Sequence, residues 1–206
     1  MFQKELNHPI FQIVSEESQK LGFQTFVVGG FVRDIFLKRT SKDVDFVTVG
    51  SGIELATAVR KRLKKAHLSV FKNFGTAQLK TDDWEFEFVG ARKESYDRNS
   101  RKPKVEDGTF EDDIYRRDFT INALAISLNA PKYGELIDLF GGMEDLKKGL
   151  IRTPLDPKIT FSDDPLRMMR AARFATQLNF TLVPETLEAL KTEAHRLSII
   201  SQERIT

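Results

Sequence analysis

Hydrophobic and polar positions divide the chain into a first part of mixed character and a second part with helical spacing throughout. In the first part, apolar residues recur at near-helical intervals in some segments and in short runs or alternations in others. Predicted helices span 9–21, 31–37 and 52–66, the last with Ser51 as its N-cap, and predicted strands span 24–28, 43–48, 68–73, 75–80, 84–89, 121–128 and 135–138. The pattern therefore predicts an α+β fold, a mixed sheet flanked by helices.

The second part begins near residue 160, from which apolar side chains keep helical spacing to the end of the sequence. Gly149, Pro154 and Pro157 punctuate the change. We therefore expect a head over 1–150 and an all-helical neck over 151–206. The last helix looks unfinished at 201–206, so we expect that a longer protein has been cut there.

A polar segment, 92–113, is predicted to be a mobile loop. Its charge changes from mainly basic over 92–104 to acidic over 105–113.

Composition narrows the class of protein. The 206 residues include 32 Lys and Arg and 30 Asp and Glu, a net charge of +2, which argues against a purely electrostatic nucleic-acid binder but not against local basic patches. The absence of cysteine excludes disulfides, thiolate metal sites and a Cys nucleophile. No apolar run is long enough for a membrane span and no signal pattern opens the chain, so we expect a cytoplasmic protein without a membrane partner. The 17 Phe residues are interpreted as core filling.

Two acidic side chains, Asp43 and Asp45, lie two apart on a predicted strand. Period-two geometry places both on one face, with Val44 pointing into the core. Paired carboxylates repel each other unless a cation lies between them, and Mg²⁺ takes such oxygen ligands together with phosphates and water. Taken alone, the pair also fits a solvated strand face.

A glycine turn strengthens the first interpretation. Gly29 and Gly30 follow a strand and precede a short helix with Arg33, an arrangement whose backbone N–H groups and guanidinium suit phosphate oxygens. Glu85 and Glu87 share a face of another strand, and either could supply a third carboxylate, to hold a second metal ion or to accept a proton. A phosphate-binding turn and a metal site are the two parts that a phosphoryl-type transfer reaction requires.

These motifs, in this order and spacing, resemble the class II nucleotidyltransferases of the polymerase-beta-like superfamily, which comprise bacterial tRNA nucleotidyltransferases (CCA-adding enzymes) and bacterial poly(A) polymerases. The matching stretches are 28–34 (VGGFVRD), 42–46 (KDVDF), 74–76 (FGT), 87–92 (EFVGAR), 116–123 (RRDFTINA), 138–142 (DLFGG) and 163–174 (DDPLRMMRAARF), and 203–205 (ERI) looks like the start of a further motif. The resemblance implies a polymerase-beta-like head followed by a helical neck.

The resemblance also implies roles for individual residues. Asp43 and Asp45 would be the metal ligands, with Glu87 as the third catalytic carboxylate. Gly29, Gly30, Arg33 and Arg117 would hold the incoming nucleotide and its triphosphate, and Asp164, Arg167, Arg170 and Arg173 would form the nucleotide-reading helix. Asp163 stands where Glu is more usual in the family and is not a candidate.

The spacing of the last four residues, one every three positions, predicts a stripe along one helix. Cytosine and adenine each present an amino donor beside a ring-nitrogen acceptor, whereas uracil and guanine present the reverse. A carboxylate accepts and a guanidinium donates, so Asp164 beside Arg167 would favour C and A. The alternative is a local ion pair between these two side chains on a solvated face.

We therefore expect a template-independent RNA nucleotidyltransferase that uses Mg²⁺ as cofactor and adds CMP and AMP, from CTP and ATP, to the 3′ end of tRNA. Poly(A) addition by the same machinery is one alternative. A non-catalytic nucleotide- or RNA-binding module, using the basic stretch 98–104 and the basic end of the 52–66 helix, is another. Transfer to a small molecule is disfavoured by the 116–123 motif, and the sequence does not determine the oligomeric state.

Overall fold

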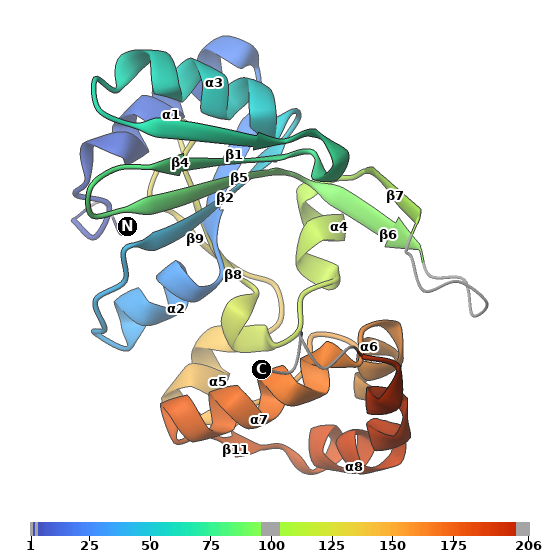
Figure 1. Cartoon of the computed structure of the whole chain (residues 1–206). Helices are drawn as coiled ribbons and strands as arrows, with labels where there is room; N and C mark the ends of the chain where they lie inside the picture. Colours follow the sequence, from blue (N-terminus) through green and yellow to red (C-terminus); the bar gives the residue numbers. More distant parts are fainter. Residues whose placement is uncertain (1, 3, 96–103, 201–206) are drawn as a thin grey trace.

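The computed structural model describes residue 2, residues 4–95 and residues 104–200. Its centre is a seven-stranded sheet in the order β3-β4-β5-β2-β1-β8-β9 (Figure 1). The strands are β1 (Gln24–Val28), β2 (Asp43–Val49), β3 (His67–Phe71), β4 (Thr76–Lys80), β5 (Glu85–Gly90), β8 (Leu124–Ser127) and β9 (Leu136–Asp138). Only β2 and β5 are parallel to each other within this sheet, so the sheet is mixed, as the sequence predicted.

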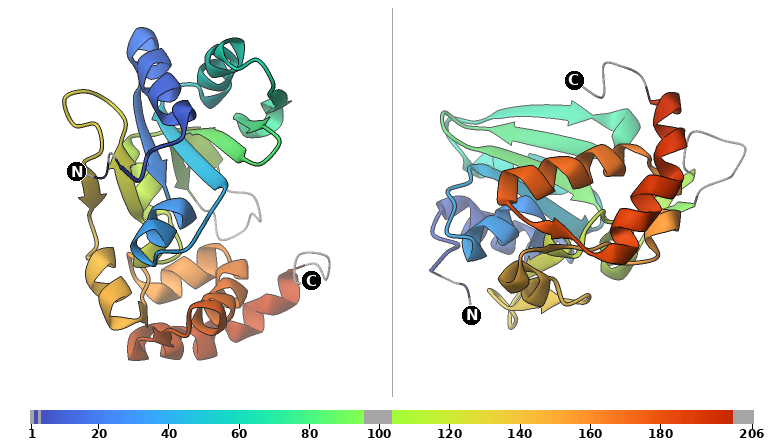
Figure 2. Two further views of the ribbon diagram at one scale, coloured as in Figure 1. Left: turned by 90° about the vertical axis from the view of Figure 1, so that its left-hand side faces the viewer. Right: turned by 90° about the horizontal axis from the view of Figure 1, so that it is seen from below.

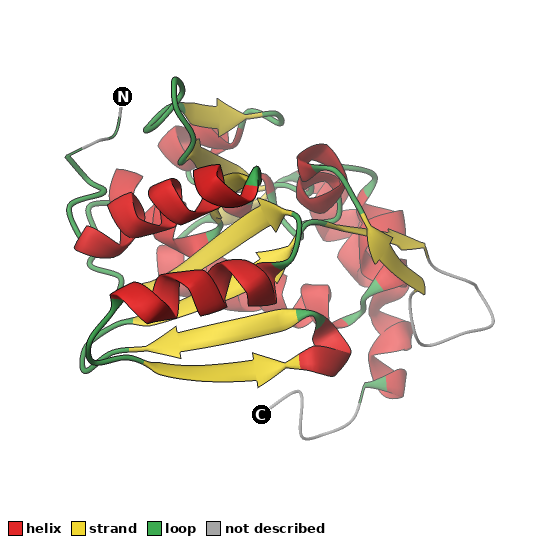
Figure 3. Cartoon of the chain, turned by 90° about the horizontal axis from the view of Figure 1, so that it is seen from above, coloured by secondary structure: helices red, strands yellow, loops and turns green. Residues whose placement is uncertain are grey.

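Two helices, α1 (Pro9–Leu21) and α3 (Gly52–Arg62), cover one face of the sheet (Figure 3). The period-two alternation of the strands sends Val44, Phe46, Phe86 and Phe88 to this face, where they are buried. The Ser51 side chain accepts a hydrogen bond from the Glu54 backbone N–H and caps α3, which ends at Arg62 rather than at residue 66. The residues buried between these layers belong to the larger of the two apolar cores.

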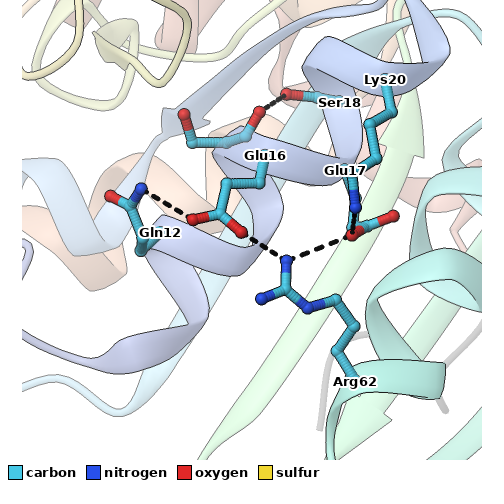
Figure 4. A network of polar contacts seen from close by, with 7 residues as sticks. Gln12, Glu16, Glu17, Ser18, Lys20 and Arg62 are labelled. Atoms are coloured by element: carbon cyan, nitrogen blue, oxygen red, sulfur yellow. Dashed lines mark hydrogen bonds and ion pairs between the residues drawn. The ribbon is translucent and has the colours of Figure 1, made fainter.

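The two helices are also tied to each other by polar contacts (Figure 4). Arg62, at the end of α3, bonds Glu16 and lies 3.2 Å from the Glu17 carboxylate of α1. Lys20 approaches Glu17 to 2.7 Å. Because these groups are largely at the surface, they fix the orientation of the helices more than they add to stability.

The opposite face of the sheet carries α4 (Phe110–Tyr115), and here the prediction of a mobile loop over 92–113 is wrong. Residues on both sides of 96–103 form a pair of antiparallel strands, β6 (Arg92–Ser95) with β7 (Lys104–Asp107), and α4 follows them. The switch from basic to acidic residues along this segment is explained by the strand register, which pairs Arg92 with Asp107 and Lys93 with Glu106. Opposite charges therefore face each other across the two strands. A capping box between Thr109 and Asp112 then starts α4. Most of the basic stretch 98–104 lies outside the described residues.

Helix α4 is fixed to the sheet by apolar contacts. Phe110 stacks on Phe26 with the ring centroids 3.9 Å apart, and Ile114 is fully buried in the same cluster. This second core is smaller than the first and lies on the face that also carries Asp45.

The remaining elements pack beneath the sheet, as Figures 1 and 2 show. They are α2 (Gly30–Phe36), η2 (Thr120–Asn122), α5 (Gly142–Lys148), β10 (Leu150–Ile151), α6 (Pro157–Asp163), α7 (Leu166–Leu178), β11 (Thr181–Leu182), α8 (Pro184–Glu193) and η3 (Ala194–Ile199). A short 3₁₀ helix, η1 (Lys72–Phe74), instead connects β3 to β4. The predicted strand over 121–128 begins only at Leu124, because 120–122 form a 3₁₀ turn. The segment after 151 is helical as expected, except that β11 pairs with β10.

The stretch 201–206, where a further helix and motif were expected, lies outside the described residues. In the described part of the chain, no helix combines the length and apolar character needed to cross a bilayer.

Candidate functional site

Four carboxylates line one face of the parallel pair β2 and β5. Asp43 stands opposite Glu85 and Asp45 opposite Glu87 in the register of the two strands. Val44 between the two aspartates is buried in the core on the other face. The sequence prediction that Asp43 and Asp45 share a face, with Val44 inward, is therefore confirmed.

The electrostatics of this face disfavour several negative charges together. Burial raises the pKa of Asp45; the Arg117 guanidinium opposes the rise and the Asp43 charge adds to it. Burial also raises the pKa of Glu87, and the charge of Asp45 raises it further. A cation bound among these oxygens would relieve both the repulsion and the loss of solvation.

The glycine turn lies directly beside Asp45. Gly29 has φ 74° and ψ −135°, a conformation that only glycine adopts readily. A Cβ atom placed on Gly29 would lie 3.2 Å from Arg117 Nη1 and 3.5 Å from Asp45 Oδ2. The structure thus brings Gly29, Asp45 and Arg117 together, from three separate segments of the chain.

Arg33, on α2, belongs to a polar chain that crosses to α7. Its Nη1 donates to Asn122 Oδ1 at 2.9 Å, and Asn122 Nδ2 donates to Asp118 Oδ1 at 3.1 Å. The other oxygen of Asp118 accepts a hydrogen bond from Arg170 Nε at 2.6 Å. Arg33 also pairs with the adjacent Asp34 at 2.9 Å.

One aromatic ring, that of Phe174, gathers three of the candidate arginines. The guanidinium carbons of Arg33, Arg170 and Arg173 lie 5.2, 5.2 and 5.0 Å from the centre of the ring. A guanidinium group near the face of an aromatic ring is attracted by the electron-rich π system, so the ring can hold several cations on one surface. Phosphate oxygens are the natural ligands for guanidinium groups collected in this way.

The predicted stripe of four residues on one helix is only partly present. Asp164 has extended backbone between α6 and α7, and its Oδ1 accepts a hydrogen bond from the Leu166 backbone N–H at 3.1 Å. Arg167 is buried, and its terminal nitrogens donate to the carbonyls of Thr160 (3.2 Å) and Arg116 (2.5 Å). The Pro165 ring restricts Asp164 to extended backbone, so the helix starts after it. Arg167, Arg170 and Arg173 lie on α7, which begins at Leu166, so Asp164 is the one member of the four outside that helix.

Sequence reasoning assigned no role to four residues that organise this region. Asp113, Asp118, Asn122 and Phe174 are all buried, and the first three bond to candidate arginines directly. For the three polar residues the signal is burial without loss of hydrogen bonds, which is visible only once the fold is known. Phe174 gave no signal beyond that of a core aromatic residue.

Asp43 and Asp45 together fit a two-carboxylate site for a divalent cation such as Mg²⁺. Among the residues that the structure describes, no group of three or more His, Cys, Asp or Glu is arranged to hold a metal ion by itself. Asp43 and Asp45 supply two hard oxygen donors at one strand, which suits an ion that completes its shell with water and substrate phosphates.

Comparison with known proteins identifies the fold. A model of the poly A polymerase head domain matches residues 25–152. The A-adding tRNA nucleotidyltransferase of Aquifex aeolicus is 46% identical over 179 residues, covering 87% of this chain and 21% of that protein. The CCA-adding enzyme of Bacillus subtilis is 39% identical over 200 residues, covering 96% of this chain and 47% of that protein.

Solved structures agree with this assignment. A tRNA nucleotidyltransferase complexed with a primer tRNA and an incoming ATP analog superposes with a TM-score of 0.80 at 40% identity, covering 93% of this chain and 53% of that one. A CCA-adding enzyme with CTP gives 0.82 at 34% identity, covering 96% and 44%. The chain thus spans about half the length, or less, of these relatives. By sequence and by fold, the chain belongs to the poly A polymerase head domain family, whose nucleotidyltransferases generally depend on divalent metal ions.

Proposed function

We propose that the chain is the catalytic head of a template-independent tRNA nucleotidyltransferase that adds CMP and AMP, from CTP and ATP, to the tRNA 3′ end. The observation that carries the proposal is the meeting of Asp45, Gly29 and Arg117 where β1 ends and the antiparallel β2 begins. A carboxylate beside a phosphate-accepting turn and a guanidinium is what transfer of a nucleotidyl group needs. The CCA-adding relatives, one solved with CTP, support tRNA end completion over poly(A) addition. Since tRNA is the proposed substrate, we place the protein in the cytoplasm.

The proposed reaction is an in-line displacement. The RNA 3′-oxygen forms a bond to the α-phosphorus, the bond from that phosphorus to the bridging oxygen of the β-phosphate breaks, and pyrophosphate leaves. Asp43 and Asp45 would hold Mg²⁺, which when bound favours the alkoxide and neutralises phosphate charge. Arg117 and Arg33 would orient the triphosphate from two sides of the Gly29–Gly30 turn. Glu87, whose pKa is raised, is suited to accept the proton of the hydroxyl.

Discrimination between bases is proposed to begin at Asp164. Its carboxylate would accept the amino hydrogen of cytosine or adenine and would meet a carbonyl in uracil or guanine. Arg167 could take part only by exchanging one of its two carbonyl contacts for the base, because both terminal nitrogens donate to the backbone in this structure.

The test supplies the protein with tRNA transcripts that lack one, two or three of the terminal CCA residues, and with each labelled nucleoside triphosphate in turn. We expect CMP then AMP to be added, and a loss on the order of 10³-fold in the single-turnover rate with Asp43→Asn or Asp45→Asn. Asp82→Asn, a change at an exposed aspartate in the turn before β5, should leave the rate unchanged. Near-normal rates in both β2 variants would rule out the proposed chemistry.

The A-adding relative supplies a second candidate function. If only AMP is added, and only to tRNA that already ends in CC, the protein is an A-adding enzyme. Extension of generic RNA by many AMP residues would instead indicate a poly(A) polymerase.

A further inference from the structure

A fully buried carboxylate, that of Asp113 on α4, lies behind Arg117. Its Oδ2 accepts a hydrogen bond from Arg117 Nη2 at 3.0 Å. Its Oδ1 accepts hydrogen bonds from Arg116 Nε at 3.2 Å and Nη2 at 2.9 Å. One buried anion is therefore shared by two guanidinium groups, which are three and four residues further along the chain.

Asp113 is itself held from outside the site. Phe110 and Ile114, on either side of it in α4, are buried against the sheet, and Phe110 stacks on Phe26. On the far side, Arg116 also pairs with Glu94 of β6 at 3.2 Å. The carboxylate thus has a fixed position relative to β1, which carries the Gly29 turn at its end.

The other two guanidinium nitrogens of Arg117 take no part in this hydrogen bond. Nη1 lies 3.2 Å from the position of a Cβ on Gly29, and Nε is buried without a hydrogen-bond partner in the described structure. A buried donor left without a partner is costly unless a ligand completes it. Arg117 therefore has one nitrogen, Nη2, bound to its support and another, Nη1, beside the Gly29 turn, where it could serve an anion.

We propose that Asp113 is a positioning residue for nucleotide binding: its carboxylate holds the Arg117 guanidinium over Gly29 in the orientation that receives the triphosphate. The inference rests on the proposed function, since it assigns the support of a residue in that same site. Without this support, the Arg117 side chain would have to be ordered at the moment of binding, which reduces affinity.

The test measures the dissociation constant for CTP, in the presence of Mg²⁺, in the 206-residue chain and its variants. Asp113→Asn should weaken CTP binding by about tenfold or more, as the loss of an outer-shell partner commonly does. The control is Asp112→Ala, which removes the carboxylate that accepts hydrogen bonds from Thr109 in the capping box of the same helix, without touching either arginine. It should lower thermal stability but leave the CTP affinity unchanged.

A double-mutant cycle separates positioning from general structural damage. In an Arg117→Gln background, Asp113→Asn should produce no further loss of affinity, because its effect passes through Arg117. A further loss in the double variant, or an unchanged affinity in Asp113→Asn alone, overturns the inference. If Asp113→Asn does not fold, Asp113→Glu, which keeps the charge but displaces it by one methylene, enters the same cycle with the same expected result. Failure of the unmodified chain to bind CTP would overturn the proposed function as well, and this distinguishes the two failures.

Discussion

At the scale of single residues, Gly29 illustrates a backbone requirement that also shapes a site. Any other residue at this position would adopt the positive φ only with backbone strain. The space that its side chain would need is occupied by Arg117 and Asp45. The sequence predicted the turn and its glycines, but the identity of the neighbours could not be predicted, because they come from residues 16 and 88 positions away in the chain.

Gly29→Ala should therefore impair both stability and nucleotide binding. We expect the free energy of unfolding to fall by about 1–3 kcal/mol from backbone strain, and CTP affinity to fall because Arg117 is displaced. Gly22→Ala is the matched control: Gly22 also has a positive φ, 72°, but nothing lies within 4 Å of its Cβ position. Urea unfolding and CTP titration of both variants would test this. Equal loss of CTP affinity in the two would show that the effect is strain alone.

His8 has a definite role in the fold. Its Nδ1 accepts the hydrogen bond from the Ile10 backbone N–H at 3.2 Å and caps α1, while its ring lies 4.8 Å from that of Trp84. Partial burial lowers its pKa below the ordinary 6.5. A protonated imidazole has no acceptor nitrogen and places a positive charge at a helix N-terminus.

The lowered pKa of His8 in the folded chain makes the folding stability depend on pH. Because the folded chain binds fewer protons at His8 than the unfolded chain does, stability should fall as pH decreases from about 7 to 5. His8→Asn keeps an acceptor at the cap and removes the titration. The unfolding free energy of the original chain relative to this variant should decrease by about 0.5 kcal/mol over that range, since solvent screens the half-exposed ring. A pH-independent difference between the two proteins would contradict this role.

At the scale of elements, the strands of the main sheet could be predicted because apolar alternation is a local property. Along β5, Phe86 and Phe88 alternate with Glu85 and Glu87, and the two phenylalanines point into the core, as the period of two requires. The pairing of β6 with β7 could not be found in this way, because it has little apolar pattern and depends on charges that meet across two strands. The break between α6 and α7 at Asp164 was missed for a related reason, since a regular three-residue spacing does not show where a helix begins.

The turn between α6 and α7 gives a prediction about base choice. Asp164→Asn keeps the acceptor for the Leu166 N–H but adds amide donors, which can pair with the carbonyl of uracil. The preference for CTP over UTP should fall by about tenfold, the effect of one unpaired polar group. Asp156→Asn, at the N-cap of α6, is the control and should leave the ratio unchanged. An unchanged ratio in Asp164→Asn would remove Asp164 from base selection.

At the scale of the whole molecule, the sheet and the helical part meet through the chain from Arg33 to Asn122, Asp118 and Arg170. The four residues belong to α2, the segment before β8 and α7, which no local pattern links. Phe174 lies beneath the two terminal arginines and packs edge-on against Phe119, 5.9 Å between centroids. The candidate nucleotide-binding groups of the head and of α7 are therefore ordered together, as the proposed transfer reaction at their junction would require.

The contact between Asp118 and Arg170 should accordingly be a strong one. A double-mutant cycle with Asp118→Asn and Arg170→Gln, followed by urea unfolding, should give a coupling of about 1.5–3 kcal/mol, the value of a charged hydrogen bond to a buried carboxylate. The exposed pair Lys148 and Glu144, 3.2 Å apart, serves as a control and should give about 0.5 kcal/mol or less. A coupling no larger than that of the control would mean that α7 is held against the head by its apolar face alone. The arginines of α7 would then be placed by packing around Phe174, and removing Asp118 should leave their contribution to CTP binding unchanged.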